Sequence, residues 1–109
     1  MFVSGYKAMW IMVMFDLPVL LKKQRKAATR FRKDLMNDGF WMIQYSVYAR
    51  PCPSDESAEV HLARVQLALP ADGQVRILQV TDKQYGRMKV YFGKKGKKPE
   101  VIPGQLELF

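Results

Sequence analysis

The sequence has very little cysteine and histidine. Among 109 residues there is one cysteine, Cys52, and one histidine, His61. A single cysteine excludes an intrachain disulfide, and Cys52 has no partners at the spacing of zinc ligands. We therefore expect a protein of a reducing, cytoplasmic setting.

Long hydrophobic runs are also absent. The apolar stretch that begins at Ala8 stops at Asp16 and Pro18, and no small-residue cleavage site follows. We expect neither a signal peptide nor a membrane span. With 49% hydrophobic residues, the chain suits one domain, and because a domain this short buries little of its surface, we expect it to complete its core as a homodimer.

Acidic residues are scarce around the cations. The chain has ten Asp and Glu and eighteen Lys and Arg, which gives a formal net charge of +8. Fourteen of the eighteen cations lie in two segments that contain no acidic residue. Such clusters predict binding to a polyphosphate backbone, although a solvated helix face and a soluble tail have the same pattern. An anionic membrane is a weaker alternative, because no wide apolar stripe adjoins either segment. The cations are Lys22, Lys23, Arg25, Lys26, Arg30, Arg32 and Lys33 in the first segment, and Lys83, Arg87, Lys89, Lys94, Lys95, Lys97 and Lys98 in the second.

Asp16 ends the hydrophobic segment Trp10-Ile-Met-Val-Met-Phe15. A carboxylate at the edge of an apolar core requires a metal ion, a hydrogen-bonded turn or a basic partner. In a basic protein this favours Mg²⁺ chemistry beside a phosphate backbone, since Mg²⁺ needs only one or two protein carboxylates. The simpler interpretation is a turn-forming Asp before Leu17 and Pro18.

The hydrophobic periodicity predicts alternating strands and helices. We expect a central strand over residues 7–15, a helix over 20–37 that buries Ala28, Phe31 and Leu35, and an extended segment over 40–50 that is kinked or split near Ser46. A second helix should follow an N-cap at Ser54, and strands should follow over 75–81 and 88–92. The apolar stripe of this second helix should consist of Ala58, Leu62, Val65 and Leu69.

This order predicts an α+β fold, a ferredoxin-like two-layer sandwich with both helices on one face of an antiparallel sheet. We expect residues 1–109 to form one such domain. Residues 93–103 should be a mobile basic loop, and residues 105–109 a C-terminal edge strand. The fold alone does not decide function.

The segments Phe15-Asp16-Leu17-Pro18 and Gln44-Tyr45-Ser46-Val47-Tyr48, with the basic helix between them, resemble the Cas-two family of CRISPR spacer acquisition. The resemblance covers residues 7–92, and the segment Val80-Thr-Asp-Lys-Gln-Tyr85 is similar to versions from type II systems. The family often has Tyr where this chain has Phe15, so a hydroxyl that could position a phosphate is missing.

The resemblance implies a prokaryotic homodimer in which two Asp16 carboxylates face each other and share one Mg²⁺. Asp16 would be the catalytic and metal-binding residue, with Phe15 and Ser46 in supporting positions. The basic helix carries over as a region, chiefly Lys23, Arg25, Arg30 and Arg32. We interpret Ser46 as a strand hydroxyl bonded to the backbone or to Asp16, and His61 as a surface or packing residue. The cations that we expect to bind nucleic acid are Lys22, Lys23, Arg25, Lys26, Arg30, Arg32, Lys33, Lys94, Lys95, Lys97 and Lys98.

Three functions follow as hypotheses. The first is an adaptor that holds duplex prespacer DNA and bridges Cas-one integrase dimers, with residues 105–109 pairing to a neighbouring subunit. The second is a Mg²⁺-dependent endonuclease acting on single-stranded RNA or duplex DNA, including a stand-alone toxin-type endoribonuclease. The third is a plain RNA-binding module, which is disfavoured because Lys89-Val-Tyr-Phe-Gly-Lys94 has the wrong order for that motif. We expect Trp10, Trp41, Tyr45 and Phe92 in the core or the dimer interface instead.

Overall fold

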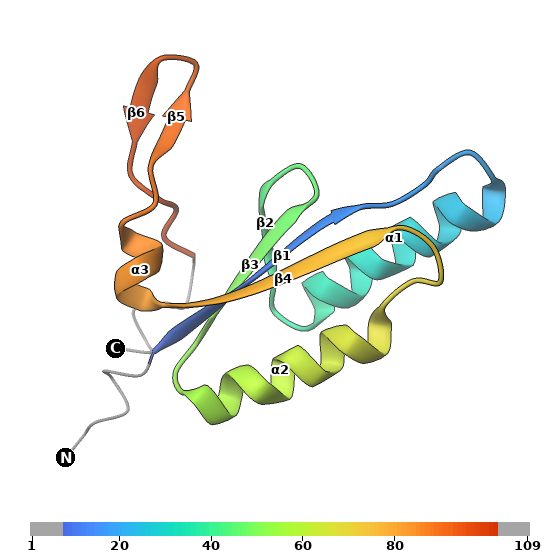
Figure 1. The fold of residues 1–109 in the computed structure, drawn as a ribbon, viewed down its shortest axis with the longest axis horizontal. Coiled ribbons are helices and arrows are strands. Elements are labelled where there is room, and N and C mark those ends of the chain that lie inside the picture. Colours follow the sequence, from blue (N-terminus) through green and yellow to red (C-terminus); the bar gives the residue numbers. More distant parts are fainter. Residues whose placement is uncertain (1–7, 103–109) are drawn as a thin grey trace.

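The computed structural model describes residues 8–102, and its framework is a four-stranded antiparallel sheet in the order β2-β3-β1-β4 (Figure 1). A separate two-stranded hairpin follows the sheet in the chain. The elements are β1 (Met9–Asp16), α1 (Lys22–Asn37), β2 (Trp41–Gln44), β3 (Val47–Cys52), α2 (Asp55–Ala68), β4 (Gln74–Thr81), α3 (Asp82–Gly86), β5 (Val90–Phe92) and β6 (Lys95–Lys97).

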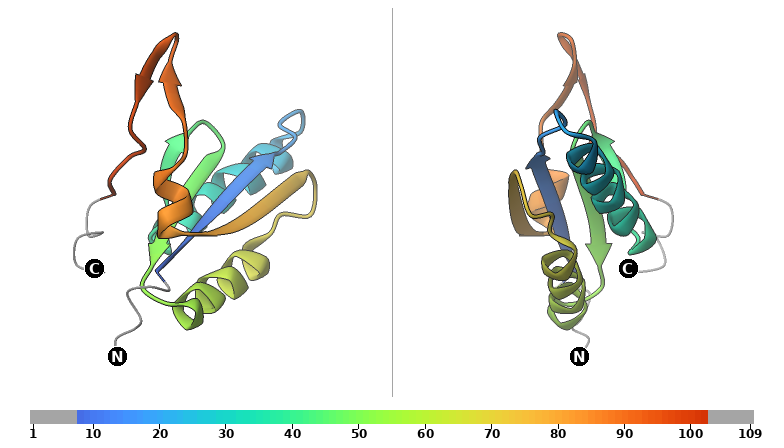
Figure 2. Two further views of the ribbon diagram at one scale, coloured as in Figure 1. Left: turned by 60° about the vertical axis from the view of Figure 1, so that its left-hand side comes forward. Right: turned by 90° about the vertical axis from the view of Figure 1, so that its right-hand side faces the viewer.

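The first six elements follow the β-α-β-β-α-β order of a ferredoxin-like fold, which confirms the predicted fold class. Helices α1 and α2 cover the same face of the sheet (Figures 1 and 2). Their buried side chains join those of β1 and β3 in one core, which includes Val13, Phe31, Tyr48 and Val65.

Strand β1 lies between β3 and β4 and is buried on both faces at its start, as predicted for a central strand. Trp10, Ile11 and Val13 are fully buried. The predicted split near Ser46 is also confirmed, because β2 and β3 are joined by a two-residue turn, Tyr45 and Ser46.

Helix α2 begins as predicted, since the Ser54 hydroxyl accepts a hydrogen bond of 3.1 Å from the Ser57 amide. The predicted apolar stripe is wrong at its end. Leu69 follows the last helical residue and is exposed, whereas His61 is buried on the inner face beside Ala58 and Val65.

The sheet face opposite α1 and α2, here called the outer sheet face, has a second small core that the periodicity did not predict. Helix α3 places the Tyr85 ring against the indole of Trp10, with ring centroids 3.7 Å apart and planes 3° apart. The Trp10 indole also donates a hydrogen bond of 2.7 Å to Asp82. These contacts cover only the end of the outer sheet face at which Trp10 lies.

Residues 93–102 differ from the mobile loop that we predicted. Lys95–Lys97 form β6, which pairs with β5 as a hairpin that projects away from the main sheet (Figure 1). A positive φ at Gly93, 64°, allows the tight turn between the two strands. The predicted edge strand at 105–109 lies outside the described residues. Within residues 8–102, no helix is both long enough and apolar enough to cross a membrane.

Candidate nucleic-acid interface and carboxylate site

Asp16 is the last residue of β1, and the sheet register decides which way it faces. Side chains alternate along a strand, so Asp16 shares the outer sheet face with Trp10, Met12 and Met14. Its cross-strand partner on β4 is Gln74. The carboxylate is exposed in the single chain, so the cost of burying it arises only when another molecule covers this face.

The part of the outer sheet face near Asp16 is apolar and open to solvent. Leu78 of β4, opposite Met12, is 48% exposed, and Trp41 of β2 is 47% exposed. Arg76, opposite Met14, is the neighbouring cation on this face. Leu78 and Trp41 lie in the cross-strand row of Met12, so the exposed apolar area begins four residues along β1 from Asp16.

The backbone at Asp16 is fixed by the turn that precedes β4. Gly73 has φ of +98°, and a Cβ atom on it would lie 2.9 Å from the Asp16 carbonyl oxygen and 2.7 Å from Leu17 Cδ2. Only glycine tolerates both the dihedral angle and the close approach. The position of Asp16 therefore depends on residue 73, which sequence reasoning treated only as part of a turn.

Ser46 lies in the β2–β3 turn rather than in a strand, and its hydroxyl contacts Arg32 rather than Asp16. Arg32 Nη2 donates a hydrogen bond of 3.4 Å to Ser46 Oγ. The same guanidinium lies over the rings of Phe15 and Tyr45, at 5.4 and 5.5 Å from their centroids. The predicted strand position of Ser46 is wrong, because β2 ends at Gln44 and Ser46, with a φ of 61°, is the second residue of the turn.

Phe15 is buried against the Phe31 and Tyr48 rings, at centroid distances of 5.1 and 5.7 Å, so its role in the fold is packing. Its amide donates to the Ser46 carbonyl oxygen at 3.1 Å. The supporting positions predicted for Phe15 and Ser46 are thus adjacent. They hold the turn beside the end of β1.

Helix α1 brings most of its predicted cations onto one surface, here called the α1 basic stripe. Positions three and four residues apart share a helix face, and this spacing continues from residue 22 to residue 33. The stripe lines a shallow groove together with Thr29. Its cations are Lys22, Arg25, Lys26, Arg30 and Lys33.

Two predicted α1 cations point elsewhere. Arg32 is turned toward Phe15 and Ser46, as described above, and Lys23 lines a separate pocket between the start of α1 and the segment 70–72. Arg25 is also partly engaged within the chain, because its Nη1 donates hydrogen bonds of 2.9 and 3.0 Å to the carbonyl oxygens of Val19 and Leu20. The first turn of α1 has no acid. Cations there oppose the positive end of the helix dipole, an arrangement that a bound anion would relieve.

The four predicted hairpin lysines are exposed, but they do not join the α1 basic stripe within one chain. Figure 1 shows the hairpin and the start of α1 at different ends of the molecule. Lys97 Nζ lies 4.6 Å from the centroid of the Phe92 ring, which is itself exposed. The lysines are Lys94, Lys95, Lys97 and Lys98.

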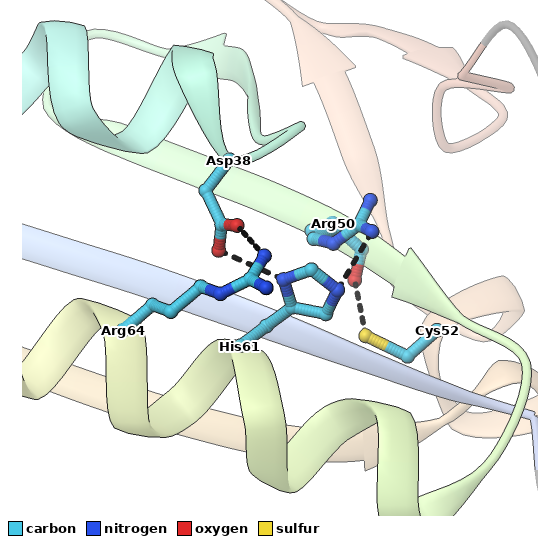
Figure 3. Close-up of polar contacts among 5 residues, drawn as sticks. All are labelled: Asp38, Arg50, Cys52, His61 and Arg64. Carbon is cyan, nitrogen blue, oxygen red and sulfur yellow. Dashed lines mark hydrogen bonds and ion pairs between the residues drawn. The ribbon is translucent and has the colours of Figure 1, made fainter.

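His61 belongs to a buried ion-pair network between the two helices and β3 (Figure 3). Its Nδ1 lies 2.8 Å from Asp38 Oδ2, its Nε2 lies 2.8 Å from Arg50 Nη2, and Arg64 Nη1 donates to Asp38 Oδ1 at 2.8 Å. Since Arg50 can only donate, Nε2 is the acceptor and Nδ1 carries the hydrogen that goes to Asp38. His61 is thereby a packing residue, as predicted.

The same network is far from Asp16 and its surroundings on the outer sheet face, here called the carboxylate site. Arg50 pairs with Ile11, five residues before Asp16, so Arg50 lies about 16 Å from Asp16 along the strand direction. It also lies on the helix-covered face. Burial raises the pKa of the neighbouring Cys52 thiol, partly offset by Arg50, so this cysteine is an unreactive core side chain. Neither residue can serve Asp16 within one chain.

The carboxylate site is therefore small. Among residues 8–102, no three His, Cys, Asp or Glu side chains converge as metal ligands. A single exposed carboxylate still fits Mg²⁺, which accepts one or two carboxylates and completes its shell with water and substrate oxygens. We expect a second carboxylate to come from another copy of the chain.

Comparison with known proteins identifies the family. Residues 9–88 match the family described as "CRISPR associated protein Cas2". The chain is 56% identical over 101 residues to the "CRISPR-associated endoribonuclease Cas2" of Parvibaculum lavamentivorans, covering 93% of this chain and 100% of the relative. It is 48% identical to the protein of the same name in Flavobacterium psychrophilum, covering 97% and 92%.

A solved structure described as "Crystal structure of cas2" has the same fold, with a TM-score of 0.57 at 19% identity, over 87% of this chain and 97% of that one. The assignment to type II systems stays a prediction. The match over most of the domain, together with the high identity to full-length relatives, shows that this chain belongs to the CRISPR-associated Cas2 family.

Proposed function

We propose that the chain acts in CRISPR spacer acquisition as a homodimer that holds duplex DNA on its α1 basic stripes and bridges Cas-one integrase dimers. The observation that carries this proposal is the separation of two surfaces. An apolar sheet face bears Asp16, and a cationic helix face lies on the opposite side of the sheet. One surface suits a second copy of the chain, and the other suits a phosphate backbone.

The outer sheet face supports the dimer. Its exposed apolar side chains, Leu78 and Trp41, surround partly buried Met14 and Val47. Packing two such faces together would remove this area from water, at about 25 cal/mol for each Å² of apolar surface. Because Asp16 shares the face, a two-fold axis near it would bring two carboxylates together.

Two facing carboxylates would repel each other, and a divalent cation between them would remove that cost. Mg²⁺ is the cation that we propose, since it prefers oxygen ligands, and two aspartate carboxylates and water molecules would provide them. The two Asp16 side chains would hold the ion. In this role they would also stabilise the dimer.

The α1 basic stripe supports duplex binding. From Lys22 to Lys33 the helix rises about 16 Å, which corresponds to about five nucleotides of one strand at 3.4 Å each. Phosphate contacts of this kind fix position without reading sequence. That is what an adaptor for arbitrary prespacers requires.

The test is duplex affinity as a function of salt, measured by fluorescence anisotropy. The double variant Lys26→Gln/Arg30→Gln should weaken binding and lower the slope of log affinity against log salt by about two for each stripe that contacts the duplex, hence by about four for the dimer. A control with the same loss of charge is Lys83→Gln/Arg87→Gln on α3, which should keep the wild-type slope. Equal losses in both variants would show that only total charge matters and would contradict the proposed interface.

The second candidate is a Mg²⁺-dependent endonuclease, favoured by the word "endoribonuclease" in the names of both relatives. A bound Mg²⁺ supplies Lewis-acid stabilisation of charge on the scissile phosphate. Asp16 would hold the ion, and the α1 basic stripe would position the strand. Within residues 8–102 no three His, Cys, Asp or Glu side chains converge as metal ligands, so this function rests on Asp16 and on the ion that it would hold.

Cleavage assays separate the two candidates. Labelled single-stranded RNA and duplex DNA are incubated with Mg²⁺ or EDTA, and wild type is compared with Asp16→Ala at matched nucleic-acid occupancy. Metal-dependent cleavage that disappears in the variant would establish the nuclease. Absence of cleavage in both proteins, with salt-sensitive duplex binding retained, would leave the adaptor role alone.

A further inference from the structure

The segment between β1 and α1, here called the 17–21 loop, exposes three consecutive large apolar residues. Leu20 is 87% exposed, and its neighbours Val19 and Leu21 are about half exposed. The loop lies at one end of the molecule, directly before the α1 basic stripe (Figure 1). Such side chains do nothing for the fold, because they bury little surface within the chain.

The loop is nevertheless held in one conformation. Arg25 Nη1 donates to the carbonyl oxygens of both Val19 and Leu20, at 2.9 and 3.0 Å. The Leu21 amide donates to Gln24 Oε1 at 2.9 Å. The loop therefore presents Leu20 on a fixed support instead of allowing it to turn inward.

Leu21 is a poor residue for its position. It is the N-cap of α1, where Ser, Thr, Asp or Asn would bond to the free amides of the first turn, and it makes no side-chain cap hydrogen bond. Leu21 thus stands where a capping residue would stabilise the helix. Neither packing within the chain nor capping of α1 explains an apolar residue at this position.

The charges around the loop indicate a polyanionic partner. Lys22, Lys23 and Lys26 are exposed next to it, and no acid occurs from residue 17 to residue 33. The acidic neighbours of the loop are Asp16, directly before it, and Asp72, across the pocket from Lys23. An anionic membrane also attracts cations, but three apolar residues offer little area for insertion, and the α1 basic stripe has no apolar face beside it.

We propose that the 17–21 loop is a wedge, in which Leu20 enters the minor groove of duplex DNA held on the α1 basic stripe and opens one base step. Small apolar side chains that enter between base pairs unstack them and kink the duplex. The support from Arg25 is what such a wedge needs, since a mobile loop would have to become ordered on binding, at a cost in conformational entropy. This inference rests on the duplex binding proposed above.

The test uses duplexes with 2-aminopurine at successive steps, whose fluorescence rises on unstacking, and end-labelled duplexes whose energy transfer reports bending. Wild type should raise the fluorescence at one or two steps and bend the duplex. Leu20→Ser should abolish both signals and weaken binding roughly 10- to 150-fold, the loss of one buried leucine. Its salt slope should not change, because no phosphate contact is removed.

Two variants provide matched controls. Leu67, on α2, is 89% exposed and lies away from the α1 basic stripe, so Leu67→Ser should behave as wild type. Leu21→Thr should improve the cap of α1 while leaving Leu20 in place, so it should raise the thermal midpoint and keep the fluorescence signal. Thermal melts confirm that Leu20→Ser remains folded.

Each other outcome overturns the wedge. If Leu20→Ser binds, bends and unstacks as wild type does, or if wild type binds duplex without unstacking it, the wedge is wrong while duplex binding stands. If Leu20→Ser loses only binding to phosphatidylserine vesicles or to the integrase, the loop is a membrane or protein contact. If wild type binds no duplex, the proposed function itself fails.

Discussion

His61 Nδ1 lies 2.8 Å from Asp38 Oδ2, and this contact joins α2 to the end of α1 inside the protein. On the other side of the same imidazole ring, Arg50 of β3 donates a hydrogen bond to His61 Nε2. A buried network is costly to leave half satisfied, because each remaining charge or donor keeps its desolvation penalty. The contact therefore has consequences for stability and none for the carboxylate site.

Replacing His61 by leucine should lower the free energy of unfolding by about 2–4 kcal/mol, since Asp38 and Arg50 lose a partner inside the protein. Urea unfolding measures this loss. Arg64→Leu is the control, because Arg64 contacts the same Asp38 from the surface and should cost less than about 1 kcal/mol. Duplex binding of the folded His61→Leu protein should equal that of wild type. A loss of binding at full folding would assign His61 a functional role.

Gly73→Ala should destabilise the protein by about 1–3 kcal/mol and displace Asp16. The new Cβ would combine an unfavourable positive φ with contacts of 2.9 Å to the Asp16 carbonyl oxygen and 2.7 Å to Leu17. Gly86→Ala is the matched control, because Gly86 lies in α3 with open space around its Cα and should gain up to about 1 kcal/mol. Thermal melts distinguish the two variants. Equal thermal midpoints for Gly73→Ala and Gly86→Ala would contradict the close approach of residue 73 to Asp16 and Leu17.

Tyr85 should make stability fall at high pH. Burial, with a smaller effect of Glu100, raises the pKa of Tyr85 to about 12 from an ordinary value near 10. A folded-state pKa above the unfolded one means that this contribution is complete below pH 10 and is lost as the pH rises to about 12. Urea midpoints between pH 9 and 12 should therefore fall more steeply for wild type than for Tyr85→Phe. Parallel curves would show that the phenol does not titrate differently on folding.

Local sequence patterns predicted the parts of the fold that depend on local spacing. The central position of β1, the buried side of α1 at Ala28, Phe31 and Leu35, and the split near Ser46 are confirmed. Helix α3 was missed because a five-residue helix has little periodicity and depends on the contact between Trp10 and Tyr85, far apart in sequence. The hairpin was missed for a similar reason, since its lysines are typical of loops.

The candidate site was predicted unevenly. The α1 basic stripe follows from helical spacing, so it could be recognised from the cations alone. The Arg32 contact with Ser46 and the dependence of Asp16 on Gly73 could not, because both need the packing of segments distant in sequence. The alternation of β1 contained one further signal. It places Asp16 on the face of Met12 and Met14, and thus on the surface that we propose for a second copy.

In the function proposed above, two copies of the chain pair through the outer sheet face with Asp16 opposite Asp16. The variant Asp16→Cys tests this pairing directly, because Cys52 is the only other cysteine and is buried. Oxidation with copper phenanthroline, followed by non-reducing electrophoresis, should give a disulfide-linked dimer, whereas Glu59→Cys, exposed on α2 on the opposite side of the sheet, should stay monomeric on the gel. No cross-link from Asp16→Cys, or equal cross-linking of both variants, would contradict the shared carboxylate site.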